Sequence, residues 1–133
     1  MNSAPLTMGI GGQAGLVKAR EGLKVWLTEA GAENGVRDDI VLACWEATAN
    51  AIEHPVAESE QVDVQLQAAH RGDRIVVCVS DTGQWREREL DNAREGRGLG
   101  LKLMRALMDR VEIITTPRGT QVFMCRRIAP GWQ

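Results

Sequence analysis

Two pairs of short apolar segments, each pair joined by a tight turn, most constrain how this chain can fold. Residues 61–68, "QVDVQLQA", alternate apolar and polar side chains, and "RGD" turns the chain into the more apolar "RIVVCVS". Near the end of the chain, "RVEIITT" and "TQVFMCRRI" repeat this arrangement around "PRG". A period of two is typical of half-buried strands, and short turns with glycine between such strands form hairpins. The sequence therefore predicts a mostly antiparallel sheet.

Helical periodicity appears in three other segments. Residues 12–30 carry apolar side chains at intervals of three and four, a second such run covers residues 36–53 and stops at Pro55, and "LGLKLMRALMD" forms a third. Residues 6–10 read as a further short strand. The predicted fold class is α+β, a two-layer sandwich with the helices on one face of the sheet. A length of 133 residues suits a single domain over residues 1–133.

Composition narrows the classes of function. A formal net charge of −2 and a pI of about 5.7 argue against a protein that coats nucleic acid or an anionic membrane. The sequence shows no signal peptide and no membrane-spanning run, so we expect a cytoplasmic protein. Its three cysteines stand alone among apolar neighbours, which indicates reduced, buried thiols, and two histidines are too few for an imidazole metal centre.

Glu46, Asn50 and His54 recur four residues apart in "ACWEATANAIEH", at the end of the second predicted helix. Because four residues make about one helical turn, the three side chains stack along one face. A solvated surface explains such a stripe, since Cys44 and Ala47 lie on the other side. Two features favour a site instead. The stripe holds no Lys or Arg that would balance its acids, and Asn is a poor helix former.

A second candidate is "SDTG", where Asp81 leaves the apolar strand and Gly83 follows two residues later. Such a pair commonly starts a turn. In the functional interpretation, the carboxylate of Asp81 accepts a hydrogen bond from an exocyclic amine, while Gly83 lets a ligand ring approach the backbone. Taken by itself, the motif leaves both interpretations open.

A third candidate, "EGRGLGLKLM", places Gly96, Gly98 and Gly100 around the start of the third predicted helix. Unpaired N–H groups and the positive end of the helix dipole favour an anion there, and glycines let a phosphate come close. Glycines also end flexible loops. Yet Gly100 within a helix costs roughly 0.5 to 1 kcal/mol relative to Ala, which suggests that something packs or binds against it. The segment is not a Walker loop, because no Gly-Lys-Ser or Gly-Lys-Thr follows.

Taken in order, these motifs resemble the GHKL superfamily of Bergerat-fold ATPases. The resemblance covers nearly the whole chain and includes Gly119-Thr120 in the last hairpin. The short length and the "GRGLGL" box are similar to bacterial anti-sigma factors that are serine-protein kinases, including versions fused to regulatory phosphatases. The resemblance implies the Bergerat ATP-binding fold, with ATP and Mg²⁺ as cofactors.

The resemblance also implies roles for the residues outside the phosphate cradle. Asn50 would help to coordinate Mg²⁺ between the ATP phosphates, and Glu46 would take a proton from the attacking hydroxyl. Asp81 would bind the adenine amino group, with Gly83 beneath the ring and Thr120 supporting the pocket from the neighbouring strand. His54 would support the end of the helix rather than join the chemistry.

The phosphate cradle implied by the resemblance lies in the glycine-rich box. Backbone N–H groups of Gly98, Leu99 and Gly100 would bind the phosphates, and Arg97 would help to neutralise them. Residues from about 84 to 97 would form a lid over the nucleotide. The chain departs from the family at one point, because Trp85 stands where the second glycine of Asp-x-Gly-x-Gly is usual.

The implied function is that of an anti-sigma regulatory factor. It would bind MgATP, phosphorylate a Ser or Thr of a STAS-type anti-anti-sigma partner, sequester a sigma factor and form a homodimer, with no direct contact to nucleic acid or membrane. The missing glycine keeps open a non-catalytic anti-sigma or partner-switching module, possibly part of a larger regulatory phosphatase. The catalytic domain of a two-component histidine kinase is disfavoured, because no helical phosphoacceptor segment precedes these motifs in the sequence.

Overall fold

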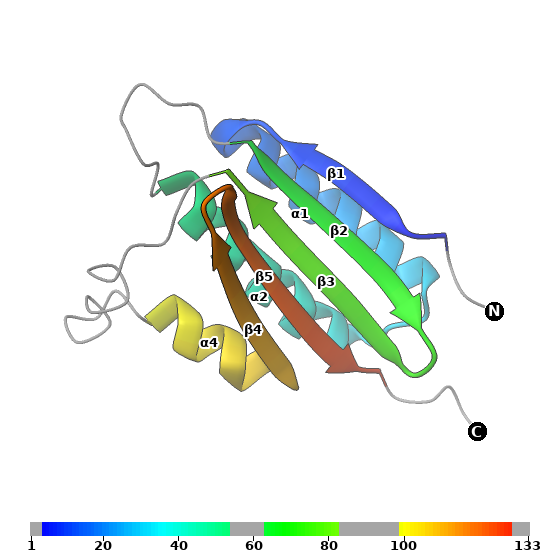
Figure 1. Cartoon of the computed structure of the whole chain (residues 1–133). Coiled ribbons are helices and arrows are strands. Elements are labelled where there is room, and N and C mark those ends of the chain that lie inside the picture. The colour runs from blue at the N-terminus through cyan, green and yellow to red at the C-terminus, as the bar shows by residue number, and fades with distance from the viewer. Residues whose placement is uncertain (1–3, 54–62, 83–98, 129–133) are drawn as a thin grey trace.

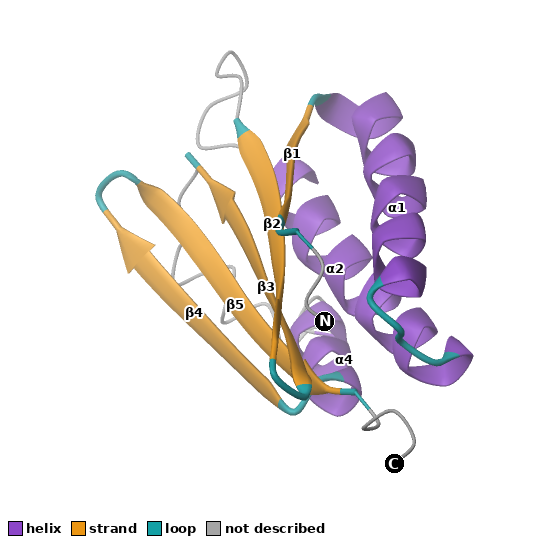
Figure 2. Ribbon diagram, turned by 90° about the vertical axis from the view of Figure 1, so that its right-hand side faces the viewer, coloured by secondary structure: helices purple, strands orange, loops and turns teal. Residues whose placement is uncertain are grey.

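The computed structural model describes residues 4–53, 63–82 and 99–128. Within these residues one antiparallel sheet has the strand order β1-β2-β3-β5-β4 (Figure 1). Its strands are β1 (Leu6–Ile10), β2 (Val64–Arg71), β3 (Arg74–Asp81), β4 (Arg110–Thr116) and β5 (Gly119–Arg127). The helices are α1 (Gly12–Glu29), α2 (Asn34–Glu53) and α4 (Leu99–Leu107). All of them lie on one face of the sheet (Figure 2), which confirms the predicted two-layer α+β fold.

The core lies between the two layers. Alternate residues of β2 and β3 are buried toward the helices, so that Leu66, Ile75 and Val77 have at most 1% of their surface exposed. Leu27 of α1 and Ile40 of α2 are fully buried against them. This alternation follows from the pleat of a strand, which sends successive side chains to opposite faces. None of the helices in the described residues is long and apolar enough to cross a membrane.

Most element boundaries match the prediction, and β2 differs most. It begins at Val64 instead of residue 61 and continues to Arg71. At its start, the hydroxyl of Thr82 accepts a hydrogen bond from the backbone N–H of Asp63 at 3.1 Å, so this N–H is satisfied by a side chain. At its end, Gly72 adopts a φ of +62°, which allows the tight turn and lets the ladder with β3 run to Arg74.

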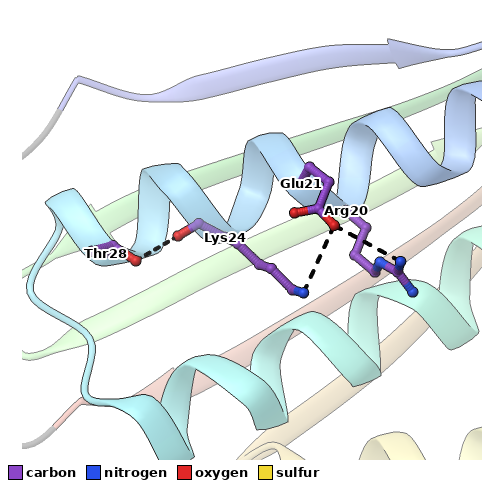
Figure 3. A network of polar contacts seen from close by, with 4 residues as sticks. All are labelled: Arg20, Glu21, Lys24 and Thr28. Atoms are coloured by element: carbon purple, nitrogen blue, oxygen red, sulfur yellow. Dashed lines mark hydrogen bonds and ion pairs between the residues drawn. The ribbon is translucent and has the colours of Figure 1, made fainter.

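Arg20 and Lys24 extend from α1 toward α2, and both form polar contacts with Glu21 (Figure 3). Glu21 lies 3.9 Å from both Arg20 and Lys24. These side chains are well exposed, so their pairing adds little stability. Arg20 also stacks over the ring of Trp45, with 4.7 Å between its guanidinium carbon and the ring centroid. The contact joins α1 to the part of α2 that carries the predicted site residues.

Candidate functional site

Glu46 and Asn50 occupy the same face of α2, one turn apart, and both are half-buried. A Cβ atom placed on Gly100 would lie 3.4 Å from the Oε2 atom of Glu46 and 3.3 Å from the Nδ2 atom of Asn50. Gly100, the second residue of α4, therefore lies close to both side chains. The sequence predicted that something packs or binds against Gly100, and the structure places two predicted site residues there. We call Glu46, Asn50 and Gly100 the helix wall.

The apolar side of α4 determines how this wall forms. Met104 of α4 is fully buried, and Met108, the residue after the helix, is 4% exposed, so the later part of α4 packs on the core. Its first turn carries Gly100 to Glu46 and Asn50. The first N–H groups of a helix have no acceptors within that helix and carry the positive end of its dipole. The junction thus combines a carboxylate, an amide and free backbone donors.

A second group of predicted residues lies where β3 ends and β5 begins. Asp81 is directly opposite Thr120 in the ladder between these strands, in the row that also contains the buried side chains of Ile10 and Val64. Asp81 therefore lies on the sheet face that the helices cover, and it is half-buried. Thr120 is fully buried. The structure thus brings together two of the three residues that the resemblance assigns to the adenine, and the third, Gly83, lies outside the described residues.

Gly119 holds this second group in place, and sequence reasoning missed that role. Its φ of +146° is a conformation that residues with a side chain rarely adopt, and a Cβ atom there would overlap the carbonyl oxygen of Asp81. The one available signal was its position directly after the "PR" of the hairpin turn. We call Asp81, Gly119 and Thr120 the sheet wall.

The two walls face the same end of the molecule. The last turns of α2, the end of β3 and the start of β5 all lie toward the upper left of Figure 1. A cavity of about 570 Å³ opens beside them, lined by residues 9–11, 63–65 and 80–82. Of the predicted site residues, only Asp81 lines it among the described residues. The cavity therefore adjoins the sheet wall and extends along the edge of the sheet away from the helix wall.

Other predicted residues lie outside the described part of the chain. These are Gly83, Arg97, Gly98, His54 and the lid at about 84–97. Leu99 is the first residue of α4, so its backbone belongs to the helix N-terminus where the resemblance expects phosphate.

The cysteines are unsuited to chemistry at this site. Cys44 lies on α2 and is 3% exposed, and burial raises the pKa of its thiol far above the ordinary range. Burial also raises the pKa of the half-buried Cys78 thiol. Because the thiolate is the reactive form, both groups are poor nucleophiles at neutral pH. All three cysteines are free, as expected, but only Cys44 is buried, while Cys78 and Cys125 are partly exposed.

The residues at the helix wall fit magnesium and phosphate. Mg²⁺ prefers oxygen ligands and is commonly held by one or two protein groups together with substrate phosphates. The side chains of Asn50 and Glu46 supply such oxygens beside the N-terminus of α4. Among the described residues, no group of three or more His, Cys, Asp or Glu side chains could hold a metal without a ligand's help. A metal here would therefore be held by these side chains together with oxygen atoms of water or of a bound phosphate.

Two solved structures share the fold of this chain. The chain superposes on a crystal structure of the RsbU and RsbW domains of Rv1364c from Mycobacterium tuberculosis with a TM-score of 0.78 and 28% identity, covering 96% of this chain and 34% of that one. It also resembles the blue-light activated histidine kinase EL346 of Erythrobacter litoralis, with a TM-score of 0.65, 20% identity and coverage of 90% and 42%. The second likeness concerns the fold alone. The chain spans about a third of the length of the first of these proteins.

The family follows from the sequence itself. A sequence profile of the histidine kinase-like ATPase domain matches residues 13–126, which include α2, α4, both walls of the site and nearly all of α1 and β5. The resemblance to GHKL ATPases of the anti-sigma kinase type is confirmed by this match together with the likeness to an RsbW domain. The chain belongs to the family of histidine kinase-like ATPase domains.

Proposed function

We propose that this chain binds MgATP between the helix wall and the sheet wall and transfers the γ-phosphoryl group to a serine or threonine hydroxyl of a partner protein. The observation that carries the proposal is the contact of Gly100 with Glu46 and Asn50. It places a carboxylate and an amide, which are 50 or more residues away in sequence, at the N-terminus of a helix. Phosphoryl transfer depends mainly on alignment and charge stabilisation, which these groups can supply.

Each wall has its own part in the proposed reaction. At the sheet wall, the adenine amino group donates a hydrogen bond to the carboxylate of Asp81, and Thr120 supports the pocket. At the helix wall, Asn50 helps to hold Mg²⁺, which neutralises phosphate charge when bound. The carboxylate of Glu46 accepts the proton of the attacking hydroxyl. The hydroxyl oxygen forms a bond to the γ-phosphorus, the bond to the bridging oxygen breaks, and ADP leaves.

Residues outside the described ranges complete the proposal. The backbone of Gly98 continues the phosphate cradle of Leu99 and Gly100, Arg97 neutralises charge, and Gly83 lies beneath the adenine. Residues from about 84 to 97 cover the nucleotide. The whole unit is a single domain over residues 1–133.

The proposed partners are a STAS-type anti-anti-sigma protein, as phosphoryl acceptor, and a sigma factor, which the chain sequesters in the cytoplasm. The likeness to an RsbW domain, at 28% identity, supports this choice. A homodimer is also proposed. Sedimentation that showed only monomer at micromolar concentration would contradict the dimer.

The kinase proposal is tested by phosphoryl transfer. Purified protein is incubated with γ-labelled MgATP and candidate STAS-domain proteins, and labelled protein is measured for wild type, Glu46→Gln and Glu33→Gln. Glu33 is exposed before α2 and serves as a control for the change in charge. We expect Glu46→Gln to bind MgATP normally and to lose a factor of about 10² to 10⁴ in rate, as removal of a general base does. Equal rates for the three proteins would exclude Glu46 as the base.

A non-catalytic binding module is the second candidate, because Trp85 replaces the second glycine of the family motif. It predicts tight binding of a sigma factor that MgATP leaves unchanged and no phosphorylation of any STAS protein. The same assay therefore separates the two candidates.

A further inference from the structure

Arg126 joins three elements at the end of the helix layer opposite the helix wall. Its partner in the ladder is Ile75, which is fully buried, so Arg126 lies on the face of the sheet that the helices cover. Its Nη1 atom lies 2.9 Å from the Oδ2 atom of Asp39 on α2 and donates a hydrogen bond to the carbonyl oxygen of Leu107. Leu107 is the last residue of α4. One guanidinium therefore binds the C-terminal end of α4 and an early turn of α2.

Helices α2 and α4 run antiparallel and meet at both ends. Asp39 and Leu107 meet through Arg126 at one end, and Asn50 meets Gly100 at the other. Seven residues separate Gly100 from Leu107, which is about 10 Å along a helix. Both contact points lie within one short rigid element, so a shift at one end moves the other.

The apolar contacts of α4 specify its position only loosely. Met104 is its fully buried side chain, while Leu101 and Leu107 are only partly buried against the core. Methionine is flexible and fills irregular gaps, so Met104 holds the helix against the core without fixing where the helix lies along its axis. A guanidinium bound to a carboxylate and a carbonyl has a defined geometry. The polar contact can thus set the orientation that these apolar contacts leave open.

We propose that Arg126 is a positioning residue for the nucleotide site: it holds the C-terminal end of α4 and thereby fixes Gly100 against Glu46 and Asn50. This inference rests on the proposed function. Met104 lies near the middle of α4, so a helix that pivots there moves both ends by similar amounts. A displacement of about 1 Å at a phosphate-binding group is enough to change affinity and rate strongly.

Removal of Arg126 should leave the fold intact. The backbone N–H of Asp109, just after α4, donates to the carbonyl oxygen of Cys125 at 2.8 Å, and the N–H of Arg127 donates to a carboxylate oxygen of Asp109. Both bonds involve groups that remain in an Arg126 variant. The chain after α4 therefore stays attached to β5, while the end of the helix loses its side-chain contact.

The test measures the affinity for MgATP by calorimetry, at a temperature where circular dichroism shows each variant to be folded. Arg126→Met removes both polar contacts, and Arg126→Lys keeps the charge without the planar fork. Arg127→Met is the matched control, because Arg127 faces the other side of the sheet and pairs with Asp73 at 3.3 Å with both side chains at least half exposed. We expect about tenfold weaker binding for Arg126→Met, a smaller loss for Arg126→Lys and no change for the control.

A double variant tests whether Arg126 acts through Gly100. If it does, Arg126→Met combined with Gly100→Ala should bind only slightly more weakly than the weaker single variant, because residues that act on one contact are not additive. Affinity losses that multiply to about a hundredfold would overturn the proposal. A lower melting temperature with unchanged affinity in Arg126→Met would assign it a structural role only.

The outcomes separate this inference from the proposed function. If wild type binds MgATP and Arg126→Met binds equally well, the positioning role fails and the nucleotide site stands. If folded wild type binds no MgATP, both fail. Should Arg126→Met not fold, Arg126→Lys carries the test, because lysine lacks the planar fork that binds Leu107 and Asp39 together, and unchanged affinity in Arg126→Lys would again overturn the positioning role.

Discussion

At the helix wall, Glu46, Asn50 and Gly100 meet because two helices pack together, whereas at the sheet wall Asp81 and Thr120 are paired in the main-chain ladder of β3 and β5. The helix wall is half-buried, while Thr120 is fully buried. Within the described part of the chain, no cation forms an ion pair with Glu46. The sheet wall is therefore held by backbone pairing within the sheet. The helix wall consists of partly exposed side chains that a ligand can contact.

The difference predicts two kinds of mutational effect. Changes at the sheet wall should lower the stability of the fold together with nucleotide binding, because the same residues serve both. Changes at the helix wall should alter binding or rate with little loss of stability. The loss of rate expected for Glu46→Gln, with MgATP binding retained, is the largest effect of the second kind.

Gly119→Ala should destabilise the fold at the sheet wall. Alanine is strained at a φ of +146° and its Cβ atom would overlap the carbonyl oxygen of Asp81, so we expect a loss of roughly 2 kcal/mol or more in the free energy of unfolding. Chemical denaturation measures this. Gly72→Ala is the control, since its φ of +62° is also unfavourable for alanine but its Cβ atom meets nothing within 4 Å. Equal losses for the two variants would show that the contact with Asp81 is unimportant.

Gly100→Ala should affect binding and spare stability. The added Cβ atom would lie 3.3 Å from the Nδ2 atom of Asn50, so the Asn50 side chain must shift by a few tenths of an ångström, while the Oε2 atom of Glu46 at 3.4 Å would be in ordinary contact. Alanine is the better helix former by roughly 0.5 to 1 kcal/mol, which offsets the strain of crowding. We expect about tenfold weaker MgATP binding, measured by calorimetry, with little change in melting temperature. Gly35→Ala, in the first turn of α2 with nothing within 4 Å, should bind as wild type does.

The smallest predicted effect is that of Cys44 on the pH dependence of stability, and it should be seen only at alkaline pH. Its folded pKa is raised by burial above the usual value of 9.0, so the unfolded chain loses this proton first as pH rises. Stability from this group is complete below pH 9 and declines above it, by up to about 1.4 kcal/mol per pH unit. The free energy of unfolding of wild type should therefore fall more steeply between pH 9 and 10.5 than that of Cys44→Ala. Parallel curves would contradict the assignment.

Much of the fold could be predicted because short-range patterns determine it. The strands β1 and β4 begin and end at the predicted residues, and the apolar run "RIVVCVS" identifies β3 to within one residue. α2 begins at Asn34, two residues before the prediction. The side chain of Asn34 accepts a hydrogen bond from Arg37, which supports the first turn despite Gly35.

The contacts among the residues of each wall could not be predicted from local sequence patterns. Glycine at position 100 signalled a close neighbour, yet nothing within the helix indicates that this neighbour is the Glu46–Asn50 face on α2. Only the resemblance to a family joined the two. Likewise, the role of Gly119 depends on the antiparallel register of β3 and β5, which brings the carbonyl of Asp81 to it from 38 residues away. Tertiary register, and no local propensity, determines such contacts.

The most direct test of the central claim, that the two walls together bind MgATP, is calorimetric titration of MgATP and of ATP with EDTA into wild type, Asp81→Asn, Asn50→Ala and Asp63→Asn. Asp63 is an exposed carboxylate at the edge of the same cavity and serves as the control for Asp81. We predict binding by wild type and Asp63→Asn, loss of binding in Asp81→Asn, and binding without magnesium dependence in Asn50→Ala. Absence of binding by folded wild type, or equal binding by all four proteins, would contradict the account.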